Sequence, residues 1–302
     1  MEGIIAVWKP AGWTSHDVVA KVRGITRERR IGHAGTLDPQ VTGVLPLCIG
    51  RATRVVEYLQ ERPKAYEAVL QLGIATDTED MTGNVIEEAD SVTVTKEQVA
   101  AVLASFVGEI EQVPPMFSAV KIDGKRLYEL AREGVTVERK ARKVTIYEIG
   151  LLDFEQDDHR PTLRFEVQCS KGTYIRTLCV DIGKKLGVPA AMAELTRTVS
   201  GGFTREDCLT IEQIAQLQQD GHLQSRIMSV DRALLHMPEA IATGRAAEMA
   251  LQGRKISAER LSGAKSLLPH QPVRLYDSNR RFLGIFEWND EQRLLSPVKV
   301  FN

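Results

Sequence analysis

The chain contains 302 residues, of which 43% are hydrophobic and 26% are charged, and its formal net charge is −1. A chain of this length buries a large core without disulfide or metal cross-links, and about one to three domains are expected. The near balance of acidic and basic residues excludes a uniformly basic protein that coats nucleic acid, and it excludes an acidic disordered tail.

The cysteine pattern and the N-terminal sequence both predict a cytoplasmic protein. The four cysteines form no Cys-x-x-Cys pair and have no zinc-ligand spacing with the six histidines. We therefore expect free thiols in a reducing compartment and no metal site. The first residues, MEGIIAVWKP, lack the basic segment, apolar region and cleavage site of a signal peptide. No charge-free apolar run approaches the roughly 18 residues that a membrane span requires, so no membrane association is expected.

Hydrophobic periodicity predicts interspersed strands and helices in the first part of the chain. Thr14 with Asp17, and Thr95 with Gln98, have the spacing of helix capping boxes. The predicted elements are a strand over 3–8, a helix after Thr14, an irregular Gly- and Pro-interrupted stretch over 31–50, a short helix over 52–59, a strand over 64–76, a helix from Thr95 closed by Gly108, a hairpin-like arm over 114–146, a strand over 163–169 and a helix over 175–186.

The C-terminal part is predicted to be a separate, strand-rich unit. The periodic pattern loosens over 220–240, and the segments that follow are a short helix over 245–251, a strand–turn–strand over 273–288 and a strand over 297–301. We therefore predict a boundary near residue 237, with domains at 1–237 and 238–302. Strands and helices that intersperse and connect through hairpin-like turns favour an α+β fold over a doubly wound sheet.

The segment GHAGTLDPQVTG, residues 32–43, is the strongest candidate for a reactive site. Three glycines and a proline shape a loop in which Asp38 is the only formally charged residue. Most isolated Asp-Pro pairs are ordinary turns in which the carboxylate caps a local N–H. A carboxylate in an apolar loop is costly unless it is paired, however, so Asp38 is a candidate nucleophile or base that needs a cationic partner.

Several blocks of this sequence resemble the bacterial tRNA pseudouridine-55 synthases, the TruB family. The blocks span residues 9–187 and comprise KP with TSHDVV, GHAGTLDPQVTGVLPLCIGRATR, KAYEAVLQLGIATDTEDMTG, VPPMFSAVKIDGKRLYELAREG and CSKGTYIRTLCVDIGKKLG. Val41 and Arg54 stand where the family usually has alanine and lysine. The resemblance implies an α+β fold with a mixed, largely antiparallel sheet and flanking helices, followed by a small PUA-like RNA-binding domain.

The resemblance also implies a reaction, the conversion of uridine 55 in the T-arm loop of tRNA to pseudouridine without a cofactor or metal. It makes Asp38 the catalytic carboxylate, which can add to uracil C6, attack C1′ or abstract the C2′ proton, and the sequence leaves these three routes open. All three need an ionised Asp38 beside a fixed cation. Arg176 matches the family's arginine partner, with an expected two-armed contact, and Tyr66 matches the aromatic that stacks on the base.

Other residues match positions that contact RNA in the family or lie on the arm. They are Tyr174 and Leu195 in the pocket, His33 as the side chain that helps to open the RNA loop, and Arg54, Lys121, Lys125 and Arg126 as RNA-binding residues. The arm resembles the insertion of stand-alone bacterial enzymes, which the guide-RNA-dependent relatives usually shorten. We therefore expect an enzyme that recognises the folded T-arm of tRNA with no guide RNA. We also expect no obligate protein partner and a monomer.

The charged residues are distributed in separate patches. Residues 21–30 and 121–143 each carry a net charge of +4 and residues 238–302 carry +3, whereas 77–90 contain six acidic residues and no basic one. Such runs are often solvated faces, but they also fit contact with RNA phosphates. Two other functions stay open at this point: an RNA-binding or tRNA-folding module with secondary chemistry, and a pseudouridine synthase that acts on another RNA.

Overall fold

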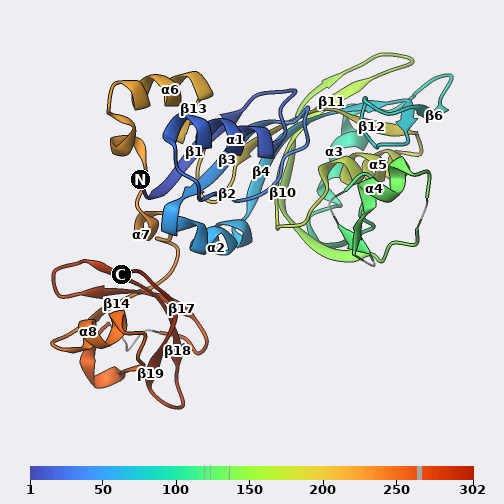
Figure 1. The fold of residues 1–302 in the computed structure, drawn as a ribbon. Helices are drawn as coiled ribbons and strands as arrows, with labels where there is room; N and C mark the ends of the chain where they lie inside the picture. Colours follow the sequence, from blue (N-terminus) through green and yellow to red (C-terminus); the bar gives the residue numbers. More distant parts are fainter. Residues whose placement is uncertain (119, 123, 136, 264–266) are drawn as a thin grey trace.

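The computed structural model describes residues 1–118, 120–122, 124–135, 137–263 and 267–302. Two sheets dominate it, one of nine strands from the N-terminal and central parts of the chain and one of six strands from the C-terminal part (Figure 1). In these described ranges, no helix is long and apolar enough to cross a membrane.

The large sheet is mixed and largely antiparallel, which confirms the predicted fold class. Its strands are β1 (Gly3–Lys9), β2 (Ile31–His33), β3 (Thr42–Ile49), β4 (Lys64–Leu72), β7 (Gly108–Gln112), β10 (Arg142–Glu155), β11 (Thr162–Cys169), β12 (Ala190–Val199) and β13 (Cys208–Leu209). Their order is β13-β1-β3-β12-β4-β11-β10-β7, with β2 paired to β3. The β1–β13 and β3–β12 pairs are parallel, and the pairs on both sides of β4 are antiparallel.

Helices flank this sheet, and two of them begin where the capping pattern predicted. They are α1 (Ser15–Thr26), α2 (Val56–Glu61), α3 (Lys96–Ala104), α4 (Leu127–Arg132), α5 (Ile175–Leu186), α6 (Ile211–Gln219) and α7 (Val230–Ala233), with short 3₁₀ segments at Gly50–Val55, Arg205–Asp207 and Leu223–Arg226. Thr14 and Thr95 cap α1 and α3 through complete capping boxes. The apolar face of α5 packs into the core beside β4 and β11.

The prediction of an irregular stretch over 31–50 was wrong, because β2 and β3 occupy most of it and only residues 34–41 form a loop. Gly43–Ile49 are buried between β1 and β12, so this strand has a continuous apolar run instead of an alternating pattern. Pro46 is tolerated opposite Ala6, and its carbonyl accepts a hydrogen bond from the Ala34 amide at 2.9 Å. The loop that carries Asp38 therefore connects two paired strands, β2 and β3, which fix both of its ends.

The predicted strand over 64–76 is broken at Gly73, whose φ of +83° ends β4. The remainder, β5 (Ile74–Thr76), pairs with β6 (Val85–Glu88) in a separate hairpin. Gly73 has no room for a side chain, because a Cβ there would lie 2.4 Å from the carbonyl oxygen of His159. Because of this hairpin, the chain after Gly73 does not continue β4, and the acidic residues of 77–90 lie beside the large sheet.

Two further boundaries differ from the prediction. The helix from Thr95 ends with its cap at Ser105, and Gly108 begins β7 instead of closing the helix. The arm is shorter than 114–146 because its last residues belong to β10, which pairs with β7 and β11. Within the arm lie β8 (Lys121–Ile122), β9 (Lys125–Arg126) and α4.

The C-terminal sheet has its own core and also packs on the rest of the protein. It consists of β14 (Glu239–Ala242), β15 (Ile256–Ser257), β16 (Leu261–Ser262), β17 (Pro272–Asp277), β18 (Phe282–Asn289) and β19 (Leu294–Val300), with α8 (Ala246–Leu251) and a 3₁₀ turn at Ala258–Arg260. Ile285 and Phe301 share a buried cluster with Ile4 and Val44 from the large sheet. The division into domains at residue 237 stays a prediction, since this cluster crosses it.

Candidate active site

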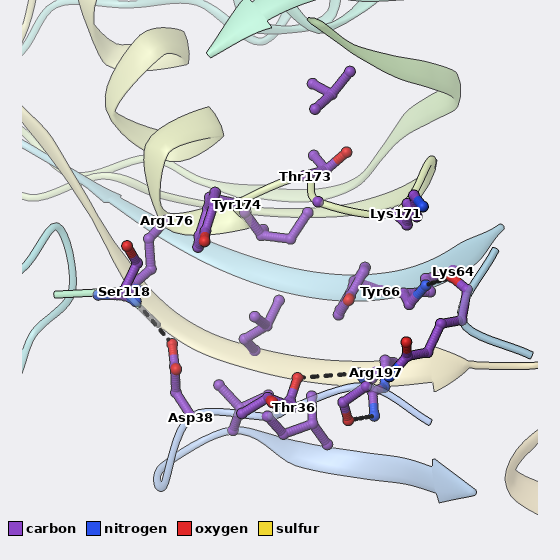
Figure 2. Close-up of a pocket in the computed structure, with 18 of the residues that line it drawn as sticks. Thr36, Asp38, Lys64, Tyr66, Ser118, Lys171, Thr173, Tyr174, Arg176 and Arg197 are labelled. Carbon is purple, nitrogen blue, oxygen red and sulfur yellow. Dashed lines mark hydrogen bonds and ion pairs between the residues drawn. The ribbon is translucent and has the colours of Figure 1, made fainter. Parts of the chain in front are cut away.

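A cavity of about 540 Å³ opens between the loop over 34–41, strands β4 and β12, and the start of α5. Figure 2 shows that side chains from these separate elements converge on it. The structure thereby brings together several residues that were selected from the sequence. They are Asp38, Tyr66, Tyr174, Arg176 and Leu195.

The loop that carries Asp38 is held by the residues that follow β1. Lys9 is fully buried, and its Nζ donates to the carbonyls of Pro39, Pro10 and Trp13 at 2.6–2.9 Å. Ser15 Oγ accepts a hydrogen bond from the Leu37 amide at 2.9 Å. Neighbours on both sides of Asp38 are therefore fixed, which accounts physically for the KP and TS residues in the first sequence block.

Asp38 lies beside Arg176, as the need for a cationic partner predicted. Arg176 Nη2 is 3.0 Å from Asp38 Oδ2, and the Arg176 side chain is 7% exposed whereas that of Asp38 is 47% exposed. The expected two-armed contact was wrong, because the structure gives a single contact. The other guanidinium donors bind the carbonyls of Thr78 at 3.0 Å and Phe117 at 2.7 Å. The arginine is thus rigidly buried, while the carboxylate faces the open cavity.

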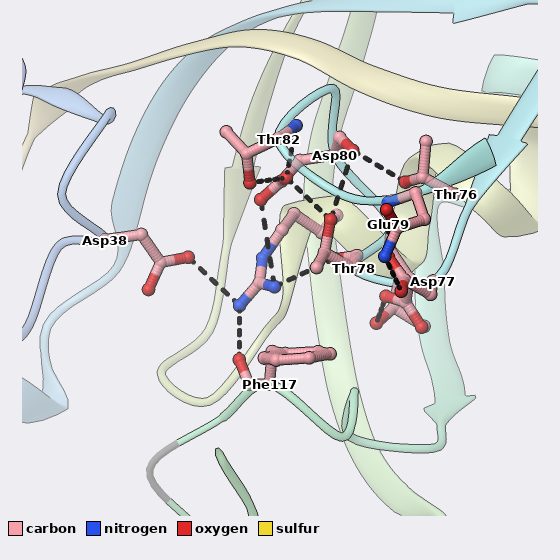
Figure 3. A network of polar contacts seen from close by, with 11 residues as sticks. Asp38, Thr76, Asp77, Thr78, Glu79, Asp80, Thr82 and Phe117 are labelled. Atoms are coloured by element: carbon pink, nitrogen blue, oxygen red, sulfur yellow. Dashed lines mark hydrogen bonds and ion pairs between the residues drawn. The ribbon is translucent and has the colours of Figure 1, made fainter. Parts of the chain in front are cut away.

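Asp80 is a second acid of this network that the sequence analysis missed (Figure 3). Its Oδ2 lies 3.9 Å from Arg176 Nη1, and its Oδ1 accepts hydrogen bonds from Thr78 Oγ1 and the Thr82 amide. The only signal for it was its place in the block TDTEDMTG. Asp80 helps to hold the guanidinium in place, so that the more exposed Asp38 is not the sole counter-charge of Arg176.

Tyr66 lies inside the cavity wall, on the buried face of β4. Burial raises the pKa of its phenol, and the nearby Arg197 acts in the opposite direction. Tyr174 precedes α5, and its backbone N–H and C=O both bind the Gln112 side chain, at 3.0 and 3.2 Å. Leu195 enters from β12. These groups give the cavity an apolar and aromatic lining beside the Asp38–Arg176 pair.

The remaining predicted residues do not line the cavity. His33 ends β2, and its ring packs edge-on against His16 with 5.8 Å between centroids. Arg54 contacts the C-terminal sheet, where its Nη1 donates to the Val300 carbonyl at 2.5 Å. Lys121 and Lys125 lie on the arm, and Lys125 pairs with Glu133 at 3.4 Å. Arg126 belongs to β9, but its side chain lies outside the described part of the structure.

Several cavity residues were not predicted at all. Lys64 and Arg197 line the end near Tyr66, and burial lowers the pKa of Lys64 to about 8. Ser118 is buried near Arg176, and its Oγ has no hydrogen-bond partner in the described ranges. Over the same ranges, no three His, Cys, Asp or Glu side chains are grouped to hold a metal ion. Lys64 begins the block KAYEAVLQLGIATDTEDMTG, whereas Arg197 lies beyond the last of the matching blocks, so only Lys64 had a signal in the sequence.

Sequence comparisons place the chain among proteins of known activity. The sequence model described as TruB family pseudouridylate synthase (N terminal domain) matches residues 23–175. Two models of TruB C-terminal domains match residues 176–235 and 242–300. The tRNA pseudouridine synthase B of Bacillus cytotoxicus is 45% identical over 99% of this chain and 97% of its own length. That of Bacillus licheniformis is 49% identical with the same coverage.

Structure comparisons give the same fold over the full chain. A chain from a crystal structure of a Cbf5-Nop10-Gar1 complex has a TM-score of 0.77 and 28% identity, with coverage of 99% of this chain and 85% of that one. A chain from a structure of an H/ACA RNP bound to a substrate RNA has a TM-score of 0.74, 26% identity and the same coverage. The similarity therefore includes the C-terminal sheet as well as the cavity.

Proposed function

The chain belongs to the TruB family of pseudouridylate synthases, and on this premise we propose that it converts uridine 55 in the T-arm loop of tRNA to pseudouridine. The observation that carries the proposal is the contact between Asp38 and the buried Arg176 in a cavity that Tyr66 also lines. A reactive carboxylate in such a cavity needs a fixed cation beside it, and the planar guanidinium of an arginine suits a carboxylate partner.

The geometry of the cavity supports the roles proposed for its residues. Asp38 is the catalytic carboxylate, since it is the exposed partner of a rigid cation. Tyr66 provides the aromatic face for the uracil, and Tyr174 and Leu195 complete the wall around it. Addition to uracil C6, attack on C1′ and abstraction of the C2′ proton all remain compatible with this arrangement, because each starts from the ionised carboxylate.

A uridine in the folded T-loop reaches this cavity only if it is flipped out of its stack. The cavity of about 540 Å³ has the size of a typical small-ligand site, which suits one extruded nucleotide. Unstacking costs on the order of a few kcal/mol, which contacts with the flipped base and the flanking RNA have to offset. Arg142, Lys143 and Lys171 line the same cavity and can bind phosphates at its entrance.

The proposal includes the way in which the tRNA is held. Lys121, Lys125 and Arg126 on the arm and His33 beside the Asp38 loop contact the T-arm, and residues 238–302 form a PUA-like RNA-binding domain. Arg54 has a place in the domain contact as well, since it binds the Val300 carbonyl. We further propose that the protein acts in the cytoplasm as a monomer. The net +4 charge of the arm residues 121–143 supports direct binding of the tRNA without a guide RNA.

The proposed function is tested with an unmodified tRNA transcript and no added nucleotide or redox cofactor. We expect pseudouridine at position 55 of the transcript, and none in a matched transcript that carries cytidine at that position. An isolated T-arm stem-loop is expected to be modified too, because its folded shape is what the enzyme recognises. If the protein modified neither the uridine-containing transcript nor the stem-loop, the proposal would be contradicted.

Two basic residues between α8 and β15 provide a prediction about binding. Arg254 and Lys255 are exposed after α8, so replacing both with glutamine is expected to weaken tRNA binding about tenfold and to reduce its salt dependence. The single-turnover rate at saturating tRNA should stay unchanged. Lys184→Gln, which removes a cation already paired with Asp181, is the control. Equal affinities for the double variant and the control would exclude this surface from the RNA interface.

A further inference from the structure

Arg197 has the largest fully buried side chain in the described part of the chain, with 1% exposure. No Asp or Glu of that part forms an ion pair with it. Its guanidinium donates instead to backbone carbonyls, at 2.8 Å to Val44, 3.1 Å to Gly35 and 3.3 Å to Thr36. A buried charge without a counter-charge is costly for folding. Its presence beside a catalytic cavity therefore calls for a reason other than a structural salt bridge.

The three carbonyls that Arg197 binds enclose the segment that carries Asp38. Gly35 and Thr36 precede Asp38, and Val44 follows it at the start of β3. Arg197 also accounts for a glycine at each end of this segment. A Cβ on Gly35 would lie 3.3 Å from Arg197 Nη1, and a Cβ on Gly43 would lie 2.2 Å from the Arg197 carbonyl oxygen. The backbone of the loop is thus packed directly on this arginine.

The same residue contacts the strand that carries Tyr66. In the register of β12 and β4, Arg197 stands opposite Tyr66. Figure 2 shows the guanidinium between Thr36 on the loop and the Tyr66–Lys64 end of the cavity. Its charge favours the ionised form of the Tyr66 phenol, against the effect of burial. One side chain therefore joins the two elements that supply the carboxylate and the aromatic ring.

We propose that Arg197 is a positioning residue that fixes the Asp38 loop and the Tyr66 phenol relative to each other, an inference that rests on the proposed function. Arg176 holds the Asp38 carboxylate from the α5 side, whereas Arg197 holds the loop backbone from the β12 side. Lysine at position 197 would keep the charge but has no planar fork for three carbonyls. The loop would then be free to shift relative to the ring.

The test compares Arg197→Lys with Arg274→Lys in single-turnover pseudouridine formation and in tRNA binding. Arg274 is the control because it is also buried, with 6% exposure, and its contacts with the Met237 carbonyl, the Tyr276 hydroxyl and Glu239 all lie outside the cavity. We expect Arg197→Lys to lower the rate about 100-fold, since displacement of reacting groups by about 1 Å has that effect. Its Kd for tRNA should stay within about threefold, and Arg274→Lys should match the wild type in both.

Coupling to Tyr66 separates a positioning role from a purely structural one. If Arg197 acts through the phenol, the rate loss of Arg197→Lys combined with Tyr66→Phe is smaller than the product of the two single losses. Arg197→Gln, which keeps amide donors without the charge, gives the same pattern and serves if the lysine variant does not fold. A wild-type rate in folded Arg197→Lys, or fully multiplicative losses, would overturn the inference. An inactive wild-type protein would instead overturn the proposed function, and the inference with it.

Discussion

The Asp38→Asn variant is expected to lose pseudouridine formation by at least about 10⁴-fold, because removal of a reacting group eliminates the chemical step. Its Kd for tRNA is expected to stay within about tenfold of the wild-type value. The variant should fold normally, since Arg176 keeps Asp80 and the carbonyls of Thr78 and Phe117 as partners. Single-turnover assays and equilibrium binding to the same transcript provide the two measurements.

Asp153→Asn is the matched control for this experiment. It removes one carboxylate from an exposed position of β10, where Asp153 binds only the neighbouring Phe154 amide among the contacts described. The control is expected to have wild-type rate and affinity. If Asp38→Asn formed pseudouridine at the rate of the control, Asp38 would not be the catalytic carboxylate. Survival of tRNA binding in the inactive variant would separate the chemistry from any role in tRNA folding.

The Arg176→Lys variant is expected to lower the single-turnover rate about 10³-fold, with a change in tRNA Kd below about fivefold. In the structure, one guanidinium contacts Asp38, approaches Asp80 and donates to two carbonyls. A lysine ammonium has three donors on a flexible stem and cannot reproduce this planar set of contacts. The carboxylate of Asp38 would stay in the cavity but lose its fixed orientation.

Arg280→Lys is the control for the loss of fork geometry alone. Arg280 lies in the turn between β17 and β18, where it binds both oxygens of Glu239 at 2.8 and 3.1 Å, away from the cavity. Surface pairs of this kind contribute little to stability, so the control is expected to keep its rate and melting temperature. A wild-type turnover rate for Arg176→Lys would show that the Asp38 carboxylate does not depend on the guanidinium.

The elements that could be predicted from the sequence are those with a clear local pattern. Capping boxes marked the starts of α1 and α3, and strict alternation marked β4 and β11. Strand β3 was not predicted, because it is apolar on both faces and contains Pro46 and Gly43, residue types that are ordinarily found in loops. The long strand β10 was not predicted in full. Its middle is half exposed and its pairing with β11 contains irregularities, so its sequence has no regular alternation of apolar and polar residues.

The same distinction holds for the candidate site. Asp38 could be found because a lone carboxylate in a glycine-rich apolar loop is unusual, and the need for a cation led to Arg176. Asp80 and Arg197 could not be found, since each acquires its place only when β5–β6 and β12 fold beside the loop. The one-armed contact of Arg176 likewise depends on the carbonyls of Thr78 and Phe117, which are far from it in the sequence.

The target of the enzyme can be measured with a position-resolved map of pseudouridine in total RNA that lacks this modification, after incubation with the purified protein alone. We expect new pseudouridine at position 55 of tRNAs, produced by the wild type and not by Asp38→Asn. No guide RNA or further protein should be required. Modification that is absent from position 55, or that appears chiefly in another class of RNA, would contradict the proposed function.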